Sequence, residues 1–395
     1  MQQQLTEAGP VERARALAPL VAEAADEIER IRQLPEPVFT ALSDAGMFHM
    51  MVPKSIGGGE VHPAIYGQAL EQLAQADAST AWSIGQNSGC SMSAAYLEPA
   101  VARECFSPPH GILAWGPFAP TSGRGVVVDG GYRVTGKWGF ASGSRHARWL
   151  GCHVLLFEAD GTTPRKHPDG RQVMRTMIFP KSSAEIIDNW QVIGLRGTGS
   201  DSYAVKDLFV PQQYSFARDS VTELRETGTL YKFTSGMMYA ISFSFVSLGM
   251  ARGSLDEFVR YANERVPRYG TRTVAHNNVI QGEVARSDAK IRASRAFILE
   301  AIDALWQEAL LGNRGNREQL RQLRLACTWA INQAQEVVNA AYNLAGAQAI
   351  FSGHPLERRM RDIHAGTQQG QGRPVQFEHV GQVMLGLEPE GPLFR

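Results

Sequence analysis

Residues 136–149 read GKWGFASGSRHARW, and residues 190–200 read WQVIGLRGTGS. Each stretch combines glycines, short hydroxyl side chains and a tryptophan, and each interrupts strand-like sequence. Such turns let a ligand approach the backbone closely and offer short hydrogen bonds beside an aromatic surface. We interpret them as a site for a flat aromatic cofactor, a flavin. The alternative is a pair of ligand-free turns in a β-rich domain.

The sequence on either side of these turns has a different period. Apolar residues recur at helical spacing before about residue 96, and again in three long units after residue 230. Between them, short β-branched and aromatic runs alternate with Gly and Asp turns, as in an antiparallel sheet. The expected fold class is α+β. The expected domains are helical at 1–107, β at 108–216 with flavin and substrate contacts, and a helical bundle at 217–395 with flavin contacts and the oligomer interface.

The composition excludes several function classes. The 395 residues carry 39 basic and 39 acidic side chains, and the basic ones are scattered, so we expect no nucleic-acid or membrane partner. No GxGxxG follows a strand and no GxxxxGK[ST] occurs, which disfavours a Rossmann nicotinamide site and a P-loop. The four cysteines lack CxxC spacing, so we expect no metal site, no disulfides and a cytoplasmic location. The uncharged stretch 233–251 contains dispersed Ser and Thr, which favours a buried helix over a membrane span.

Four segments occur in the order found in one flavoprotein superfamily: 39–59 (FTALSDAGMFHMMVPKSIGGG), 130–149, 190–211 and 345–365 (AGAQAIFSGHPLERRMRDIHA). The chain resembles the acyl-CoA dehydrogenase superfamily over nearly its whole length. It is most similar to the two-component flavin monooxygenase branch, related to the oxygenase component of p-hydroxyphenylacetate hydroxylase. The resemblance implies an N-terminal helical domain, a central antiparallel β-barrel and a C-terminal four-helix bundle. It also implies a homotetramer in which a neighbouring subunit completes the flavin site.

Ser142 is the central candidate under this resemblance. The serine of the aromatic-Ala-Ser-Gly turn lies near flavin N5 in the oxygenase branch, where a hydroxyl can hydrogen-bond the reduced ring; otherwise Ser142 only caps a turn. The other implied cofactor contacts are Trp138, Arg196, Thr198, Ser200, Arg265, Arg268, Gln281 and Gly346. Alternatives are a core position for Trp138, solvated helix ends for the two arginines after residue 260, and a helix C-cap for Gly346. Asn278 replaces one glutamine of the family pattern, which leaves FMN or FAD open.

Two positions that often hold histidine in the relatives are filled differently here. Gln369 stands eight residues after Arg361, and Cys90 stands eight residues after Trp82. His364 could substitute as a base, as could His146, although either could be purely structural. Arg361 and Asp362 are expected to form an ion pair. The expected catalytic residues are Ser142, His364 and Gln369, and the expected substrate contacts are Cys90, Trp115 and His146.

The choice between oxygenation and dehydrogenation depends on a carboxylate base. Dehydrogenation of an acyl thioester needs a carboxylate to remove the α proton. The family's C-terminal motif appears as IHAGT, with Ala365 in place of Glu, and the family's second location, 231–255, contains no Asp or Glu. We therefore expect a flavin-dependent monooxygenase that takes reduced FMN or FAD from an NAD(P)H:flavin reductase and hydroxylates an apolar or aromatic small molecule. The alternatives are an acyl-CoA dehydrogenase-like flavoprotein with a non-standard base, or a flavin-binding or nucleic-acid-associated protein that has lost catalysis.

Overall fold

Helices form the N-terminal part of the chain in the computed structural model, which describes residues 8–117, 122–389 and 393–394. They are α2 (Pro10–Glu23), α3 (Ala25–Ile31), α4 (Glu36–Asp44), α5 (Pro63–Ala76), α6 (Ala78–Ser91) and α7 (Pro99–Phe106). Proline stands in the first turn of α2, α4, α5 and α7, where its fixed φ suits a helix start. The Asp77 carboxylate caps α6 by accepting from the Thr80 backbone N at 2.7 Å. The predicted domain 1–107 begins with seven residues that lie outside the described ones.

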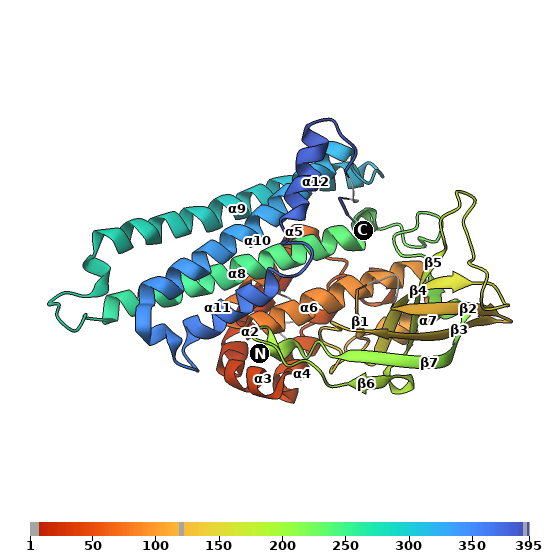
Figure 1. Ribbon diagram of the computed structural model, residues 1–395, viewed down its shortest axis with the longest axis horizontal. Coiled ribbons are helices and arrows are strands. Elements are labelled where there is room, and N and C mark those ends of the chain that lie inside the picture. Colours follow the sequence, from red (N-terminus) through yellow and green to blue (C-terminus); the bar gives the residue numbers. More distant parts are fainter. Residues whose placement is uncertain (1–7, 118–121, 390–392, 395) are drawn as a thin grey trace.

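An open, mixed β-sheet follows these helices (Figure 1). Its strands are β1 (Leu113–Trp115), β2 (Gly123–Val128), β3 (Gly131–Trp138), β4 (Trp149–Phe157), β5 (Met174–Pro180), β6 (Glu185–Ile187), β7 (Ser202–Pro211) and β8 (Ser215–Phe216). The order is β6-β7-β3-β2-β4-β5-β8, and β1 also pairs with β4. Because β1 and β2 both run parallel to β4, the expectation of a purely antiparallel sheet is wrong. The described strands do not close into the expected barrel.

The pairing of β2 with β4 determines the path of the segment that connects β3 to β4. After the β2–β3 hairpin, the chain pairs β4 with β2 and not with β3. β3 and β4 are therefore antiparallel to each other with β2 between them, so residues 139–148 must pass the end of β2 to reach β4, and we call this connection the crossover. The serine-containing turn is this crossover.

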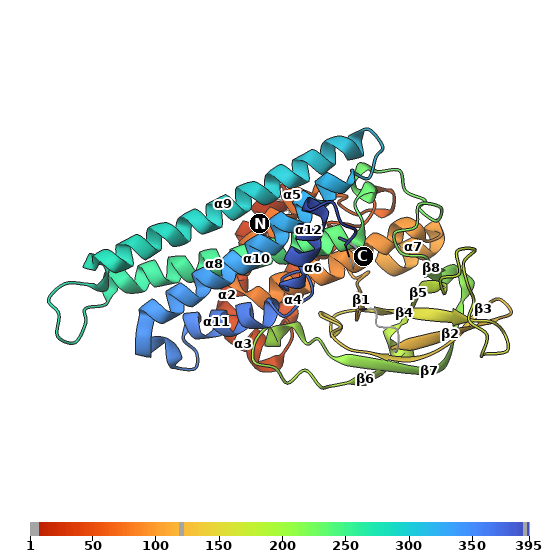
Figure 2. The same cartoon turned by 45° about the horizontal axis from the view of Figure 1, so that its top comes forward.

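Long helices make up the C-terminal part, and Figures 1 and 2 show them side by side. They are α8 (Ser235–Glu264), α9 (Asn278–Leu310), α10 (Arg317–Ala345), and the shorter α11 (Pro355–Gly366) and α12 (Val375–Met384). The stretch 233–251 lies mostly in α8, whose first half is buried among other helices, as predicted. Among the described residues, none of the helices has the length and apolarity that a membrane crossing requires. The N-terminal helices, the sheet and the C-terminal helices share one hydrophobic core.

Candidate functional site

The two glycine-rich turns that the sequence analysis assigned to one site lie against each other. The Gly143 backbone N donates to the Thr198 carbonyl at 2.9 Å, and the Ala141 N donates to the Asp201 carbonyl at 3.2 Å. Their side chains form what we call the hydroxyl chain, Ser142, Ser200 and Thr198. The Ser142 and Ser200 Oγ atoms are 2.7 Å apart, and Ser200 Oγ is 2.6 Å from Thr198 Oγ1. All three side chains are buried.

The hydroxyl chain has a direction, because each hydroxyl group has one proton to donate. Thr198 donates its proton to the Leu195 carbonyl oxygen at 2.8 Å, and a carbonyl oxygen can only accept. The proton between Thr198 and Ser200 must therefore come from Ser200, and the proton between Ser200 and Ser142 must come from Ser142. The Ser142 oxygen is left with free acceptor capacity at the end of the chain.

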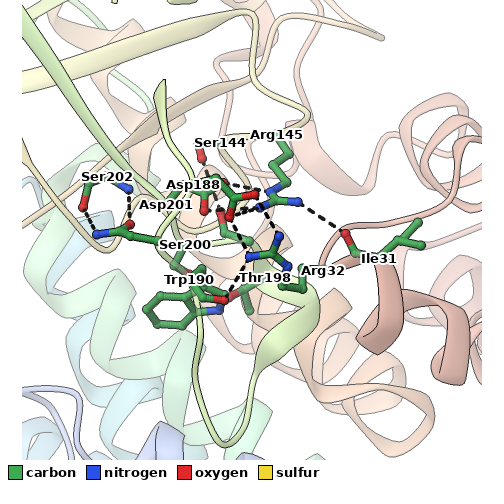
Figure 3. A network of polar contacts seen from close by, with 12 residues as sticks. Ile31, Arg32, Ser144, Arg145, Asp188, Trp190, Thr198, Ser200, Asp201 and Ser202 are labelled. Carbon is green, nitrogen blue, oxygen red and sulfur yellow. Dashed lines mark hydrogen bonds and ion pairs between the residues drawn. The ribbon is translucent and has the colours of Figure 1, made fainter. Parts of the chain in front are cut away.

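A network of arginines and aspartates surrounds the two turns, and Figure 3 shows it. The Arg145 guanidinium bonds Asp201 at 2.8 and 3.3 Å and Asp188 at 3.2 Å. Arg32, the C-cap of α3, pairs with both Asp188 oxygens at 2.6 and 2.8 Å. Arg145 also donates to the Ile31 carbonyl at 3.3 Å, so the network ties both turns to the end of α3.

Helix α11 holds the other side of the second turn. The Leu195 backbone N donates to Asp362 Oδ1 at 2.6 Å, and Arg361 donates to the Ile193 carbonyl at 2.7 Å. Arg361 forms its ion pairs with Glu357 and Glu29, so the expected pair between Arg361 and Asp362 is wrong. Neighbouring residues on a helix point in different directions, which is the physical reason. Burial raises the pKa of Asp362 to about 7, and the nearby Asp77 carboxylate adds to the rise.

Helix α6 supports the first turn through Asn87. The Asn87 amide donates to the Leu113 carbonyl at 3.0 Å and to the Ser142 carbonyl at 3.3 Å. Gly143, with φ of +74°, passes so close that a Cβ there would lie 2.3 Å from Asn87 Oδ1. Only glycine combines this left-handed backbone with so close an approach. Sequence reasoning missed Asn87, because nothing in its local sequence distinguishes it.

An aromatic and thiol cluster continues from this point between α6, α8 and β1. Cys90 Sγ lies 3.5 Å from the Tyr239 hydroxyl, and the Gln86 amide donates to the Trp115 carbonyl at 3.4 Å. The rings of Trp82, Phe243 and Tyr239 follow one another, with centroids 4.0 and 5.9 Å apart. Burial raises the pKa of the Cys90 thiol to about 12, so the thiol is neutral. The structure thus groups two predicted substrate contacts, Cys90 and Trp115, in a neutral aromatic environment.

The aromatic residue exposed at the first turn is Phe140, not Trp138. Trp138 is 1% exposed, stacks on Tyr203 with centroids 5.5 Å apart, and donates its indole N–H to the His153 carbonyl. These contacts favour the core alternative for Trp138. Phe140 is 66% exposed at a φ of +59° and meets the Trp190 ring edge-on at 5.9 Å. Sequence reasoning missed it, although it is the aromatic residue directly before Ala141 and Ser142.

The predicted histidines have structural contacts. His146 Nε2 accepts from the Leu34 backbone N at 3.0 Å, and its ring stacks on Phe39. Burial, with Lys181 and Arg145 nearby, lowers the pKa of His146 to about 4. The His364 ring points to α10, with 3.2 Å from Nδ1 to the Gln335 amide and 2.9 Å from Nε2 to the Asn339 amide oxygen. Gln369 accepts from the Gln371 backbone N at 2.7 Å, and Arg196 pairs with Glu29.

The remaining predicted cofactor residues lie far from the turns. Arg265 and Arg268 are exposed in the α8–α9 connection, and exposed Gln281 donates to the Ala275 carbonyl at 2.9 Å. Gly346 is the C-cap of α10 at the same end, where the Tyr261 hydroxyl donates to the Ala345 carbonyl. Figures 1 and 2 place this end of the long helices opposite the sheet. One chain therefore does not bring this set to the hydroxyl chain.

Comparisons with known proteins agree with this architecture. Residues 11–101 match the family "Acyl-CoA dehydrogenase, N-terminal domain", and residues 241–370 match "Acyl-CoA dehydrogenase, C-terminal domain". The chain is 30% identical over 363 residues to the indole-3-acetate monooxygenase of Pseudomonas putida, covering 92% of this chain and 90% of that protein. It is 29% identical over 398 residues to the oxygenase component of the FADH(2)-dependent resorcinol hydroxylase of Rhizobium sp., covering 96% and 95%. The crystal structure of the HsaA monooxygenase from M. tuberculosis superposes with a TM-score of 0.87 at 26% identity, covering 98% of both chains.

Proposed function

The chain belongs to the acyl-CoA dehydrogenase family, among relatives that are flavin-dependent monooxygenases, and from this membership we propose that it is the oxygenase component of a two-component system. It takes reduced flavin from a separate NAD(P)H:flavin reductase. With O2, it hydroxylates an aromatic or apolar small molecule. The main support for this proposal is the direction of proton donation in the hydroxyl chain, which leaves the Ser142 oxygen as an acceptor.

Ser142 is set to accept a hydrogen bond and not to donate one. Its proton is committed to Ser200, so its oxygen keeps free acceptor capacity. A reduced flavin has a hydrogen on N5 and can donate to that oxygen, whereas an oxidised flavin has only an acceptor there. The chain direction therefore suits the reduced ring. A site for a reduced carrier is what an oxygenase component needs.

The residues around the hydroxyl chain fit a flat ring. Phe140 and Trp190 supply an aromatic edge beside the two turns. A bound reduced flavin would supply the two electrons that activate O2. This chain's residues orient the ring through Ser142 and exclude water through the buried turns. Both FMN and FAD remain within the proposal.

The cluster between α6, α8 and β1 supports the proposed substrate class. Its side chains Trp82, Phe243, Tyr239 and Trp115 are aromatic, and Cys90 is a neutral thiol. Flat apolar molecules bury well against such surfaces, while the Gln86 amide can orient one polar group. We assign Cys90 and Trp115 to this surface and leave His146 to its contact with Leu34.

The residues at the far end of the long helices support a homotetramer. Arg265 and Arg268 lie in the α8–α9 connection, Gln281 in the first turn of α9 and Gly346 at the end of α10, where Tyr261 of α8 bonds the Ala345 carbonyl. We propose that they complete a neighbour's flavin site, with guanidinium groups on flavin phosphate. The units 1–107, 108–216 and 217–395 then serve as helical cover, flavin-binding β domain and assembly bundle. The free buried thiols fit a reducing, cytoplasmic setting.

Substitution of Ser142 tests the function. Ser142→Ala removes the acceptor at the end of the chain, a hydrogen bond of about 1–2 kcal/mol in a buried site, or roughly tenfold in affinity. We expect about tenfold weaker binding of reduced flavin, little change for oxidised flavin, and more hydrogen peroxide released per NADH consumed. Ser144→Ala is the matched control, because Ser144 donates to the Gly199 carbonyl outside the hydroxyl chain.

A panel of saturated acyl-CoA compounds tests the alternative dehydrogenase function. With Ala365 on α11 and no acid between residues 231 and 255, anaerobic mixing should leave the absorbance of bound oxidised flavin unchanged. Bleaching with formation of an enoyl-CoA would refute the oxygenase proposal. Equal binding of both flavin redox states by wild type would remove its main support.

A further inference from the structure

The hydroxyl chain ends at a backbone carbonyl whose residue has an unusual conformation. The Leu195 carbonyl oxygen accepts from the Thr198 hydroxyl at 2.8 Å, from the Thr198 backbone N at 3.2 Å and from the Trp190 indole at 3.1 Å, so it receives three donors. Its φ is +52°, in the left-handed region that a branched side chain rarely adopts. Leu195 is buried, and nothing in its own side chain favours this conformation. Contacts from elsewhere must hold it.

Those contacts come from α11, and three of them fall on consecutive residues. Asp362 Oδ1 accepts from the Leu195 N at 2.6 Å, and Arg361 Nη1 donates to the Ile193 carbonyl at 2.7 Å. The backbone at Gly194 lies directly on α11, since a Cβ there would stand 2.1 Å from the Arg361 carbonyl oxygen. Donor, acceptor and close packing together fix the turn at residues 193–195. Asp362 is buried, which makes its bond to Leu195 inaccessible to competing water.

We propose that Asp362 is a positioning residue for the proposed oxygenation, because it fixes the Leu195 carbonyl as the acceptor end of the hydroxyl chain. The expected effect on flavin binding rests on the proposed function, whereas the contact between Asp362 and Leu195 does not. With the Leu195 carbonyl in place, every proton of the chain points toward it and the Ser142 oxygen stays an acceptor. Helix α11 would thus set the preference of the proposed site for reduced flavin through Asp362, whose carboxylate acts by holding Leu195.

Loss of Asp362 has a specific consequence. Without its acceptor, the Leu195 N–H is unpaired in a buried site, and the residue relaxes toward a negative φ, which turns the peptide groups around it. Thr198 then loses its fixed acceptor, and the chain can run in either direction. Ser142 can donate as well as accept, so oxidised and reduced flavin bind more equally. A general loss of packing would weaken both states alike.

The test compares Asp362→Ala with Asp362→Asn in the full-length protein. Asparagine keeps an Oδ1 acceptor for the Leu195 N–H, whereas alanine removes it. The first measurement is hydrogen–deuterium exchange of peptides covering 194–201 without flavin. The second is the dissociation constant for oxidised flavin divided by the dissociation constant for reduced flavin. Asp362→Ala should speed exchange and reduce that ratio by about tenfold, the value of one buried hydrogen bond, while Asp362→Asn should stay near wild type.

Two further variants keep the result interpretable. Gly194→Ala pushes the turn away from α11 without changing Asp362, so it should reproduce the faster exchange even if Asp362→Ala folds poorly. Asp26→Asn removes an ion pair between α3 and Arg358 of α11 but leaves the turn intact, and should behave as wild type. Unchanged exchange at 194–201 in Asp362→Ala, or an Asp362→Asn variant as impaired as Asp362→Ala, overturns the proposal. Because exchange needs neither flavin nor turnover, a failure of the proposed function would leave this part of the test standing.

Discussion

Arg145 and Asp201 form one ion pair, but we predict that substituting Arg145 destabilises the protein more than substituting Asp201. Asp201 is 2% exposed in its side chain and takes its described hydrogen bonds from Arg145, whereas Arg145 also binds Asp188 and the Ile31 carbonyl. Arg145→Met therefore leaves a buried carboxylate without a donor. Asp201→Asn leaves a guanidinium that keeps its other acceptors. We expect Arg145→Met to be the more damaging change.

The magnitudes follow from burial. Removing one partner of a buried pair costs roughly 3–5 kcal/mol, because the other charge stays uncompensated. Asp201→Asn loses one charge-assisted hydrogen bond, about 1.5–3 kcal/mol. The double variant Arg145→Met with Asp201→Leu replaces the pair by apolar side chains and should be more stable than Arg145→Met alone.

Urea denaturation followed by tryptophan fluorescence measures these differences. Protein concentration must be the same for all variants, because assembly shifts apparent stability. The order of midpoints should be wild type, Asp201→Asn, then Arg145→Met, with the double variant above Arg145→Met. If Asp201→Asn unfolds as early as Arg145→Met, or if the double variant gains nothing, the carboxylate does not depend on Arg145 and the reasoning fails.

Two other predictions concern the same turns. His146 has a pKa of about 4 in the folded protein and 6.5 in the unfolded chain, so the unfolded chain binds a proton that the folded protein does not. The free energy of unfolding therefore falls by up to about 3 kcal/mol as the pH drops from 6.5 toward 4. Denaturation at several pH values should show a weaker loss of stability in acid for His146→Gln than for wild type, and equal slopes would contradict the assignment. Gly143→Ala meets both a φ of +74° and Asn87 Oδ1 at 2.3 Å, whereas Gly130→Ala meets only a φ of +72° in open space; urea midpoints should fall more for Gly143→Ala, by about 1–3 kcal/mol beyond the control, and equal losses would mean that the contact with Asn87 is unimportant.

The helices and the main strands could be predicted because their periods are local properties of the sequence. The first of the long helical units expected after residue 230 is α8, and β4 and β5 lie inside the expected β region at 108–216. Strand pairing is not local. The parallel placement of β2 beside β4 depends on the crossover at 139–148, and no residue type in that segment predicts this pairing.

In the candidate site, too, the residues in local turns could be predicted from the sequence, whereas those on helix faces could not. Ser142 and Ser200 lie 58 positions apart in the sequence, yet both occur in recognisable turns, and the structure joins them at 2.7 Å. Side chains that act from a helix face were missed or misread, because their own sequence is ordinary. Asn87 has no local signal, and Asp362 was paired with its neighbour Arg361 although adjacent helical residues diverge.

The crossover has a consequence for how this protein can diversify. A surface loop accepts insertions with little effect on the rest of a fold. Residues 139–148, however, carry the chain from β3 across to the far edge of β2, so their length and course decide where β4 docks. Lengthening this segment would disturb the sheet together with the proposed flavin site. New ligand preferences are therefore expected to arise by exchange of side chains on α6 and α8, while the span of the serine turn stays constant.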